Sequence, residues 1–205
     1  MKKIFACLLV CLFSGSVNAI TIDFEGFTPP LTLTPSVPSV AEDGFTVTHS
    51  GSFAQIFGNT GQGATDFSGN GTNRLISFNT SSLTLTNTGG SNFNLTSFEG
   101  GESWVFEPHN WATQIQAIGT LGGGGTTTQL FNLDLIKDPI NGMEVFNFNN
   151  SFQNLSQVVF TGIGGNPEFS IDNINVSLVP EPTSLALLSL GLVGLGFSRK
   201  KKQAV

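Results

Sequence analysis

Apolar and polar residues alternate in short runs through the middle of the chain. The first run, residues 20–25, places Ile22 and Phe24 on one side of the backbone, because successive side chains of a β-strand point to opposite faces. Asp23 and Glu25 fall on the other side and make it acidic. The further runs with the length and period of strands span residues 44–48, 52–57, 75–78, 82–86, 93–98, 103–106, 112–120, 126–135, 143–148, 158–161 and 169–178.

Glycine and proline separate these runs. Four prolines within residues 28–39 predict an extended loop, since proline cannot donate to the ladder of a central strand. Residues 58–73 contain five glycines and predict the longest flexible loop. The segment 87–92 predicts a hairpin that joins its neighbouring strands in an antiparallel meander, and the glycines of 121–125 predict a tight reversal.

Many short strands joined by polar turns predict an all-β fold, an antiparallel β-sandwich of jelly-roll type. The body of the chain, residues 20–178, is long enough for one domain with its own core. The chain has 19 phenylalanines and no tyrosine, so phenylalanine must supply the aromatic part of that core, and a single open sheet could not bury it. A β-helix is the main alternative, but no fixed internal repeat supports it.

The N-terminal residues 1–19 have the order of a secretory signal peptide. Two lysines precede an apolar run, residues 4–13, and the small-residue site Val17-Asn18-Ala19 follows. We therefore expect a signal helix that signal peptidase removes before Ile20.

The last segment, residues 179–205, has a different pattern. The triplet Pro180-Glu181-Pro182 precedes an uncharged, largely apolar run that ends in the basic residues 199–202. This order resembles the PEP-CTERM sorting signal of Gram-negative bacteria. The resemblance implies that exosortase, a membrane cysteine transpeptidase, recognises the triplet and removes the tail. The body would then reach the cell surface or an exopolysaccharide matrix.

The apolar run of this tail predicts a short hydrophobic helix. At about 1.5 Å of rise per residue, such a helix is short for a permanent span of a bilayer, and transient residence in the inner membrane fits it better. An ordinary C-terminal anchor remains the alternative.

The body is strongly acidic. Residues 20–178 contain 13 Asp and Glu against two cations, Arg74 and Lys137, so their net charge is −11. Such a charge disfavours nucleic acid and anionic lipid and leaves neutral glycans, cations or proteins as expected partners. Both cysteines, Cys7 and Cys11, lie in the signal segment, so the body contains no thiol, unless Cys11 is a lipoprotein attachment site.

Acidic residues stand at both ends of the body. The sequences Asp-Phe-Glu at residues 23–25 and Ile-Asp-Asn-Ile at residues 171–174 resemble the terminal strands of jelly-roll carbohydrate-binding modules and MAM domains. The resemblance implies a structural calcium ion, which takes six to eight oxygen ligands. Its implied ligands are Glu25 and Asp172, with Asp23 or Asn173 in addition.

The last strand supports this expectation independently. Phe169 and Ile171 share one parity, whereas Ile174 and the apolar residues after it share the other. A β-bulge at Asp172-Asn173 would keep all of them on the core side and redirect the aspartate. The alternative is that these two residues form local hydrogen bonds at a strand end.

Residues 102–111 contain both tryptophans, with acids, an amide and an imidazole. A glycan site needs an exposed aromatic face with polar groups beside it. Trp104 alternates with Phe106 and is expected to face the core, whereas Trp111 follows a proline in a loop and is the better exposed candidate. Trp111, Trp104 and His109 are therefore the candidate glycan-binding residues.

Catalysis has weaker support in the sequence. The body has no cysteine nucleophile, and His49 and His109 lack the spacing of a metal site. A glycoside hydrolase with paired carboxylates could use Glu99, Glu102 or Glu107. The favoured hypothesis is an exported, non-catalytic surface or matrix protein that is structural or adhesive and binds glycan. The alternatives are a secreted glycan-active hydrolase and a passive cargo of a surface coat.

Overall fold

The computed structural model describes residues 19–61, 65–104, 106, 108–136 and 142–180. Within these residues the chain consists of β-strands and loops, with one short 3-10 helix, η2 (Pro108–Asn110). Asn18–Val179 forms one compact unit. The expected signal helix of residues 1–19 and the hydrophobic helix of residues 179–205 fall almost entirely outside the described residues.

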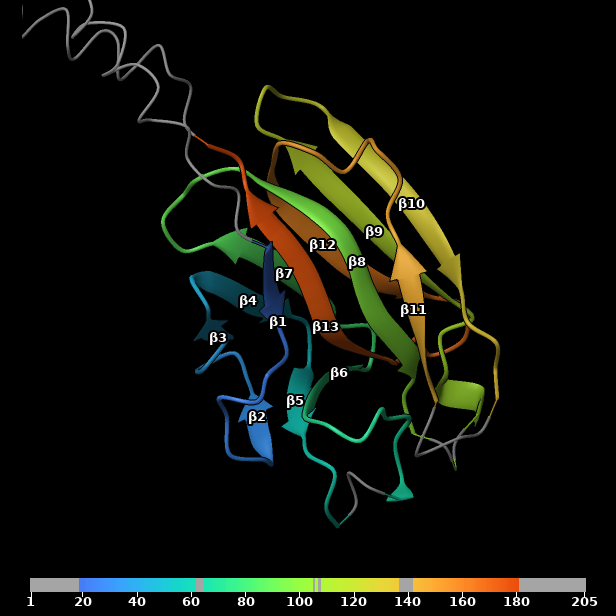
Figure 1. Ribbon diagram of the computed structural model, residues 1–205. Coiled ribbons are helices and arrows are strands. Elements are labelled where there is room, and N and C mark those ends of the chain that lie inside the picture. The colour runs from blue at the N-terminus through green and yellow to red at the C-terminus, as the bar shows by residue number, and fades with distance from the viewer. Residues whose placement is uncertain (1–18, 62–64, 105, 107, 137–141, 181–205) are drawn as a thin grey trace, which may run out of the picture. The chain divides into compact units, whose positions relative to one another are not determined.

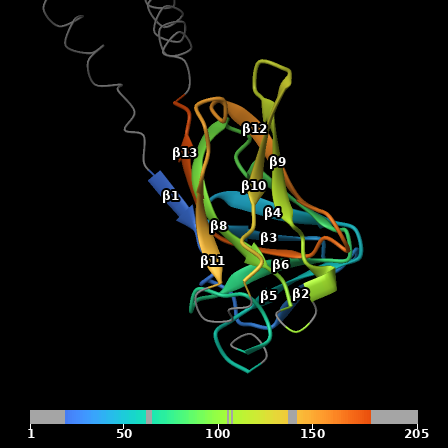
Figure 2. The same cartoon turned by 90° about the vertical axis from the view of Figure 1, so that its right-hand side faces the viewer.

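The strands form two antiparallel layers, which Figures 1 and 2 show in perpendicular views. The first layer contains, in order, β2 (Leu31–Leu33), β5 (Phe53–Phe57), β6 (Arg74–Phe78), β13 (Phe169–Leu178), β8 (Phe93–Glu102) and β11 (Met143–Asn147), with β1 (Ala19–Ile22) beside β13. The second contains β3 (Ser39–Glu42), β4 (Phe45–Ser50), β7 (Ser82–Asn87), β12 (Leu155–Ile163), β9 (Gln114–Leu121) and β10 (Thr126–Asn132). A single pair, Leu155 with Phe93, connects β12 to β8.

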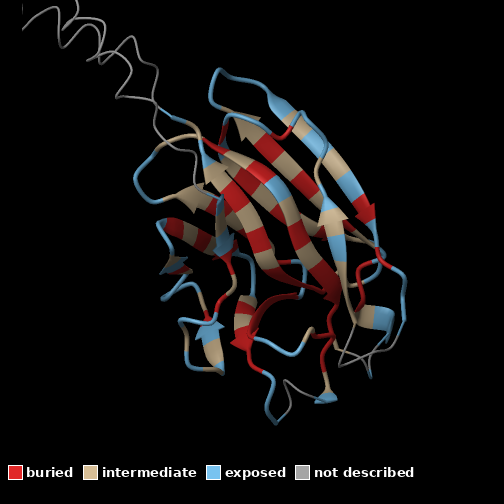
Figure 3. Cartoon of the chain, in the orientation of Figure 1, coloured by how far each residue is buried: buried red, intermediate tan, exposed pale blue. Residues whose placement is uncertain are grey.

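The core lies between the two layers, and alternation along each strand selects the residues that enter it. In β9, Ile115 and Ala117 are fully buried, whereas Gln114 and Gln116, which alternate with them, are half-buried. Figure 3 shows the same banding of buried and exposed positions along most strands. Phenylalanine supplies the aromatic part of this core, as the composition requires.

The expected all-β antiparallel sandwich is confirmed. From β6 onward every connection except the β9–β10 turn passes from one layer to the other, as in a jelly roll. That turn is the tight reversal predicted at residues 121–125, and Gly124 and Gly125 have φ angles of 93° and 86°, which favour glycine.

The expected meander is wrong. β7 pairs with β4 and β12, and β8 pairs with β13 and β11, so residues 87–92 connect the layers rather than form a hairpin. Alternation identifies a strand but does not identify its partner.

Three strand boundaries also differ from expectation. The proline-rich segment 28–39 contains the short strand β2, whose Leu33 is fully buried. β2 lies at the edge of its layer, and none of the prolines of the segment takes part in its pairing with β5. The first strand ends at Ile22, because Phe24 has a φ angle of 58°. β8 ends at Glu102, and of the run expected at 103–106 the described residues Ser103, Trp104 and Phe106 lie in no strand.

Candidate functional site

The predicted bulge in the last strand is confirmed and positions the main candidate site. The register of β13 against β8 shifts between Asp172 and Asn175, and Asn173 has a φ angle of 45°. Ile171 and Ile174 are both fully buried although they are three positions apart, which in a regular strand would place them on opposite faces. The bulge therefore keeps both isoleucines in the core.

Asp172 accepts hydrogen bonds from the loop that precedes β6. The Asn70 Nδ2 atom lies 2.8 Å from Asp172 Oδ2 and 2.5 Å from Glu99 Oε2, and Thr72 Oγ1 lies 2.9 Å from the same Asp172 oxygen. Asp172 and Glu99 are also direct cross-strand neighbours. The second oxygen of Asp172, Oδ1, is buried and has no hydrogen-bond partner. We call Asn70, Thr72, Glu99 and Asp172 the bulge cluster.

Arg74 lies next to this cluster and is fully buried. Its guanidinium donates to the carbonyl oxygens of Phe67 (3.1 Å) and Thr72 (3.4 Å). A Cβ atom on Gly69 would lie 2.8 Å from the central guanidinium carbon, so this position requires glycine. Burial lowers the pKa of Arg74 to about 10, and the charge of Asp172 partly opposes that shift.

Burial has the opposite effect on the neighbouring acid. It raises the pKa of Asp172 to about 7, and the negative charge of Glu99 acts in the same direction. Hydrogen bonds from Asn70, the Asn173 backbone and Thr72 partly offset the rise. The site therefore favours either a proton on Asp172 or a further positive charge beside it.

The loop that carries Thr72 also contacts the beginning of the body. The exposed side chain of Glu25 accepts a hydrogen bond from the backbone nitrogen of Asn73 at 2.6 Å. Asp23 Oδ1 accepts one from the backbone nitrogen of Glu25 at 3.1 Å. Glu25 and Asp172 thus contact adjacent residues of one loop, Asn73 and Thr72, whereas Asp23 forms a local turn.

Asn173 takes part in the hydrogen bonds around the bulge through its backbone. Its carbonyl oxygen accepts a hydrogen bond from Asn175 Nδ2 at 3.0 Å. Across the described parts of the chain, no three acidic, histidine or cysteine side chains converge in an arrangement that could hold a metal ion. Oxygen ligands at the bulge cluster would thus have to include Asn70 or Thr72 in addition to the carboxylates.

Asn70, Thr72 and Glu99 were not among the ligands that the sequence implied. Residues 58–73 have the composition of a flexible loop, which concealed the contribution of their last residues. One signal was present: Asn70-Gly71-Thr72 lies one residue before Arg74, one of only two cations in the body, at the start of an apolar strand. A buried cation requires polar partners, and the Thr72 carbonyl oxygen is one of them.

The expectation for the two tryptophans is wrong in part. Trp111 is only 6% exposed, and its Nε1 donates to the carbonyl oxygen of Trp104 at 2.7 Å. An indole that finds such a partner can be buried at low cost, so the loop folds inward instead of presenting the ring. Trp104 is half-buried and packs against Phe67, whereas Phe106, expected beside it in the core, is 55% exposed.

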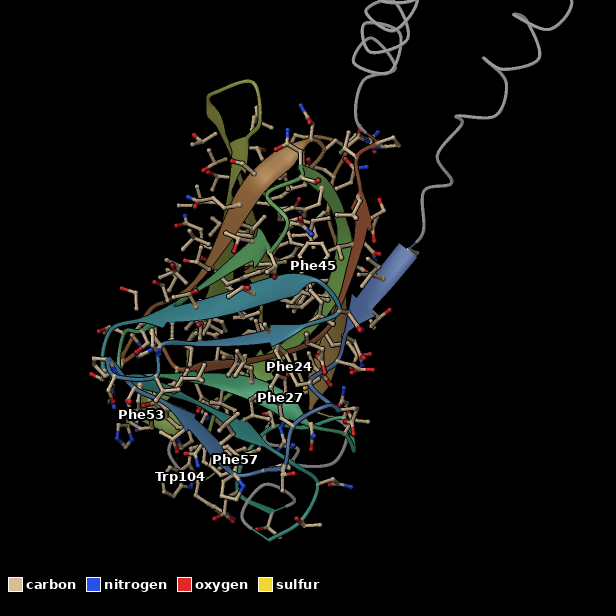
Figure 4. All side chains as sticks on the ribbon, turned by 90° about the vertical axis from the view of Figure 1, so that its left-hand side faces the viewer. Phe24, Phe27, Phe45, Phe53, Phe57 and Trp104 are labelled. Atoms are coloured by element: carbon tan, nitrogen blue, oxygen red, sulfur yellow. The ribbon has the colours of Figure 1, made fainter. Side chains whose placement is uncertain are left out.

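Trp104 belongs to a second, smaller hydrophobic cluster at one end of the sandwich. Figure 4 shows Trp104, Phe53 and Phe57 together at that end, with Phe45 farther along the layers. His109 is exposed in η2. Burial raises the pKa of the nearby Glu168, and the interaction with His109 offsets only part of that rise. Of the three candidate glycan-binding residues, Trp111 is buried, Trp104 is half-buried and only His109 is exposed.

The acids expected for hydrolysis do not form an accessible pair in the described residues. Glu102 is fully buried, its Oε1 accepts the backbone N–H of Leu135 at 2.7 Å, and burial raises its pKa. Glu99 belongs to the bulge cluster, and Glu107 lies outside the described residues. Glu144 is near Glu102, and its pKa is raised to about 7 by burial first and then by the charges of Asp134 and Glu102.

The tail provides the deciding comparison. Residues 178–200 match the PEP-CTERM protein-sorting motif. The match includes the triplet Pro180-Glu181-Pro182, so the resemblance found in the sequence is confirmed. Of the triplet, Pro180 is described and exposed, and Glu181 and Pro182 lie outside the described residues. The PEP-CTERM motif indicates an exported protein. Among the described residues no helix is long and apolar enough to cross a membrane.

Solved structures with a similar arrangement of strands are distant in sequence. A family 29 carbohydrate-binding module is 10% identical with a TM-score of 0.47, and the alignment covers 80% of this chain and 90% of that one. The K2 cleaved adhesin domain of Lys-gingipain is 12% identical with a TM-score of 0.45 and coverages of 79% and 99%. An F5/8 type C domain from Bacteroides fragilis is 8% identical with a TM-score of 0.42 and coverages of 68% and 94%. No curated protein matches the sequence.

Proposed function

We propose that the protein is a non-catalytic component of the surface or extracellular matrix of a Gram-negative bacterium. Signal peptidase removes residues 1–19, and exosortase acts at Pro180-Glu181-Pro182 and releases the body from the inner membrane. The match of residues 178–200 to the PEP-CTERM motif carries this proposal. The body, residues 20–178, then serves a structural or adhesive role by binding extracellular polysaccharide.

The composition of the body supports a neutral polysaccharide as the partner. A net charge of −11 disfavours acidic polymers, and a fold without a thiol needs no redox maturation outside the cell. Of the acids that the sequence offered for hydrolysis, Glu102 is fully buried and Glu99 is hydrogen-bonded to the Asn70 amide, so these two do not form an accessible pair. Binding rather than cleavage is therefore the activity that we propose.

Substitution of the triplet tests the sorting step. Replacement of Pro180, Glu181 and Pro182 by alanine should retain the protein in the inner-membrane fraction of the producing cell, because exosortase would no longer recognise the tail. Thr183→Ala, immediately outside the triplet, is the matched control and should reach the surface as the wild type does. Cell fractionation followed by immunoblotting measures both. Surface delivery of the alanine triplet would contradict the proposal.

We also propose that the bulge cluster holds a structural calcium ion. Asp172 and Glu99 would provide carboxylate oxygens, and Asn70 and Thr72 would provide neutral ones, with Glu25 held against the same loop by its contact with Asn73. Two observations support this set. The buried Oδ1 of Asp172 has no hydrogen-bond partner, and the Asn70 amide lies between two carboxylates, where a cation would also be stabilised.

Calcium should raise the melting temperature of the full chain at millimolar concentration. For a domain of this size each 1 kcal/mol of binding free energy adds roughly 2–4 °C. Asp172→Asn should abolish the rise, whereas Asp43→Asn, in the turn between β3 and β4, should preserve it. Differential scanning calorimetry with calcium and with a chelator measures the effect. An unchanged melting temperature in the wild type would eliminate the site.

A further inference from the structure

The outer face of the second layer carries no charge. The five strands β4, β7, β12, β9 and β10 contain no Asp, Glu, Lys or Arg, although the body has 13 acids. The one titratable residue in them, His49, is buried on the inner side. The strands of the first layer, in contrast, carry Glu99, Glu102, Glu144 and Asp172. In the second layer an acidic residue thus occurs only in the edge strand β3, as Glu42.

The outward residues of these five strands form rows that cross the layer. The central row is Thr48, Thr84, Val159, Ile118 and Thr128, in which each residue is the cross-strand partner of the next. The rows on either side contain only threonine, serine and glutamine, apart from one leucine in β10. They are Thr46, Thr86, Gln157, Thr120 and Thr126 on one side, and Ser50, Ser82, Thr161, Gln116 and Leu130 on the other. We call these three rows the threonine face.

The middle of the threonine face is apolar and its surroundings are polar. Val159 and Ile118 lie side by side and are half-buried, which leaves part of each side chain in contact with solvent. Within the described residues no hydrogen bond occupies the side chains of Thr84, Thr161 or Gln116, which surround this pair. The face therefore offers a narrow apolar strip with available hydroxyl and amide groups on the side of Thr161 and Gln116, whereas on the other side Gln157 Nε2 already donates to Thr120 Oγ1.

We infer that the threonine face is the surface on which the body binds a neutral polysaccharide chain, an inference that rests on the glycan-binding function proposed above. A sugar ring has C–H groups that can cover Val159 and Ile118 and hydroxyls that can bond to the threonines and glutamines around them. Adjacent strands are about 4.8 Å apart, so the five-strand row offers a contact at regular intervals along an extended chain.

Charge selects this occupant over others. An acidic polymer or a second copy of the chain would bring negative charge toward a body whose net charge is −11, whereas a neutral polysaccharide would not. The absence of lysine and arginine from the face also removes the groups that would hold phosphate or carboxylate. The binding surface that we infer thus lies on a layer that contains neither Trp104 nor Trp111, the tryptophans that the sequence offered as glycan-binding residues.

Affinity electrophoresis of the full chain tests the inference. The gels contain galactomannan or hydroxyethyl cellulose as neutral polymers, or alginate as the acidic one. The wild type should be retarded by at least one neutral polymer and not by alginate. Val159→Asp should weaken that retention at least about tenfold, because the carboxylate would lose its water beneath the sugar. Val145→Asp is the matched control, since Val145 is 63% exposed on β11 of the first layer, and it should bind as the wild type does.

A second variant guards against misfolding at Val159. Thr128 is exposed on the edge strand β10, so Thr128→Asp should fold normally and still weaken retention. If the wild type binds and both face variants bind equally well, the threonine face is wrong while the glycan-binding function stands. If the wild type binds none of the neutral polymers, both fail. A wild-type dimer in sedimentation that Val159→Asp converts to a monomer would reassign the face to self-association.

Discussion

Phe98→Ala should lower the free energy of unfolding by about 3–5 kcal/mol. Phe98 is fully buried on β8, and its ring centroid lies 5.0 Å from that of Phe131, 5.3 Å from Phe146 and 5.2 Å from Phe160. Phe131 and Phe160 belong to the second layer, so the substitution would open a cavity where the layers meet.

Urea unfolding of the full chain, followed by tryptophan fluorescence, measures this change. Val145→Ala serves as the control, because Val145 is 63% exposed and its truncation should alter the free energy of unfolding by less than about 0.5 kcal/mol. A loss below about 1 kcal/mol in Phe98→Ala would show that the two layers do not meet around this ring.

Stability should fall as pH rises from 5 to 8 in chelated buffer. Burial raises the pKa of Asp172 to about 7 from an ordinary value of 3.8, and that of Glu144 to about 7 from 4.5. Between these limits the folded protein binds more protons than the unfolded chain, so the free energy of unfolding decreases with rising pH and levels off above the folded pKa values. One pKa unit corresponds to about 1.4 kcal/mol, so the buried Asp172 should account for roughly 2 kcal/mol, and Glu144 should add less because solvent screens its charge.

Urea unfolding at intervals across this pH range measures the slope. Asp172→Asn and Glu144→Gln should each flatten part of it, because neither amide titrates, and the double variant should flatten it most. Addition of calcium to the wild type should restore stability at pH 8, where Asp172 is ionised, more than at pH 5. A wild-type curve that rises from pH 5 to 8 in chelated buffer would contradict the burial of these two acids.

Much of the fold followed from alternation, because a half-buried strand has to place every second side chain in the core. The same argument predicted the bulge. Ile171 and Ile174 have opposite parity, so a strand that buries both side chains needs an extra residue between them. Pairing partners could not be predicted, because β7 and β8 have equivalent patterns and alternation does not distinguish a hairpin from a connection between layers.

The candidate sites were harder to predict for a different reason. Trp111 has the local sequence of an exposed loop residue, and only the distant carbonyl of Trp104 makes its burial favourable. Asn70 and Thr72 belong to the bulge cluster through contacts with Asp172, a residue about 100 positions later in the chain. Such contacts depend on tertiary structure. The tail, in contrast, was predictable because its motif is contiguous.

The central claim is that the tail directs the body to the cell surface and is then removed. Mass spectrometry of the protein recovered from the surface or matrix of the producing cell tests it most directly. The claim predicts mature chains that end near Pro180-Glu181-Pro182 and yield no peptide from residues 185–205. An intact C-terminal Val205 on most molecules would contradict it and would identify the tail as a retained anchor.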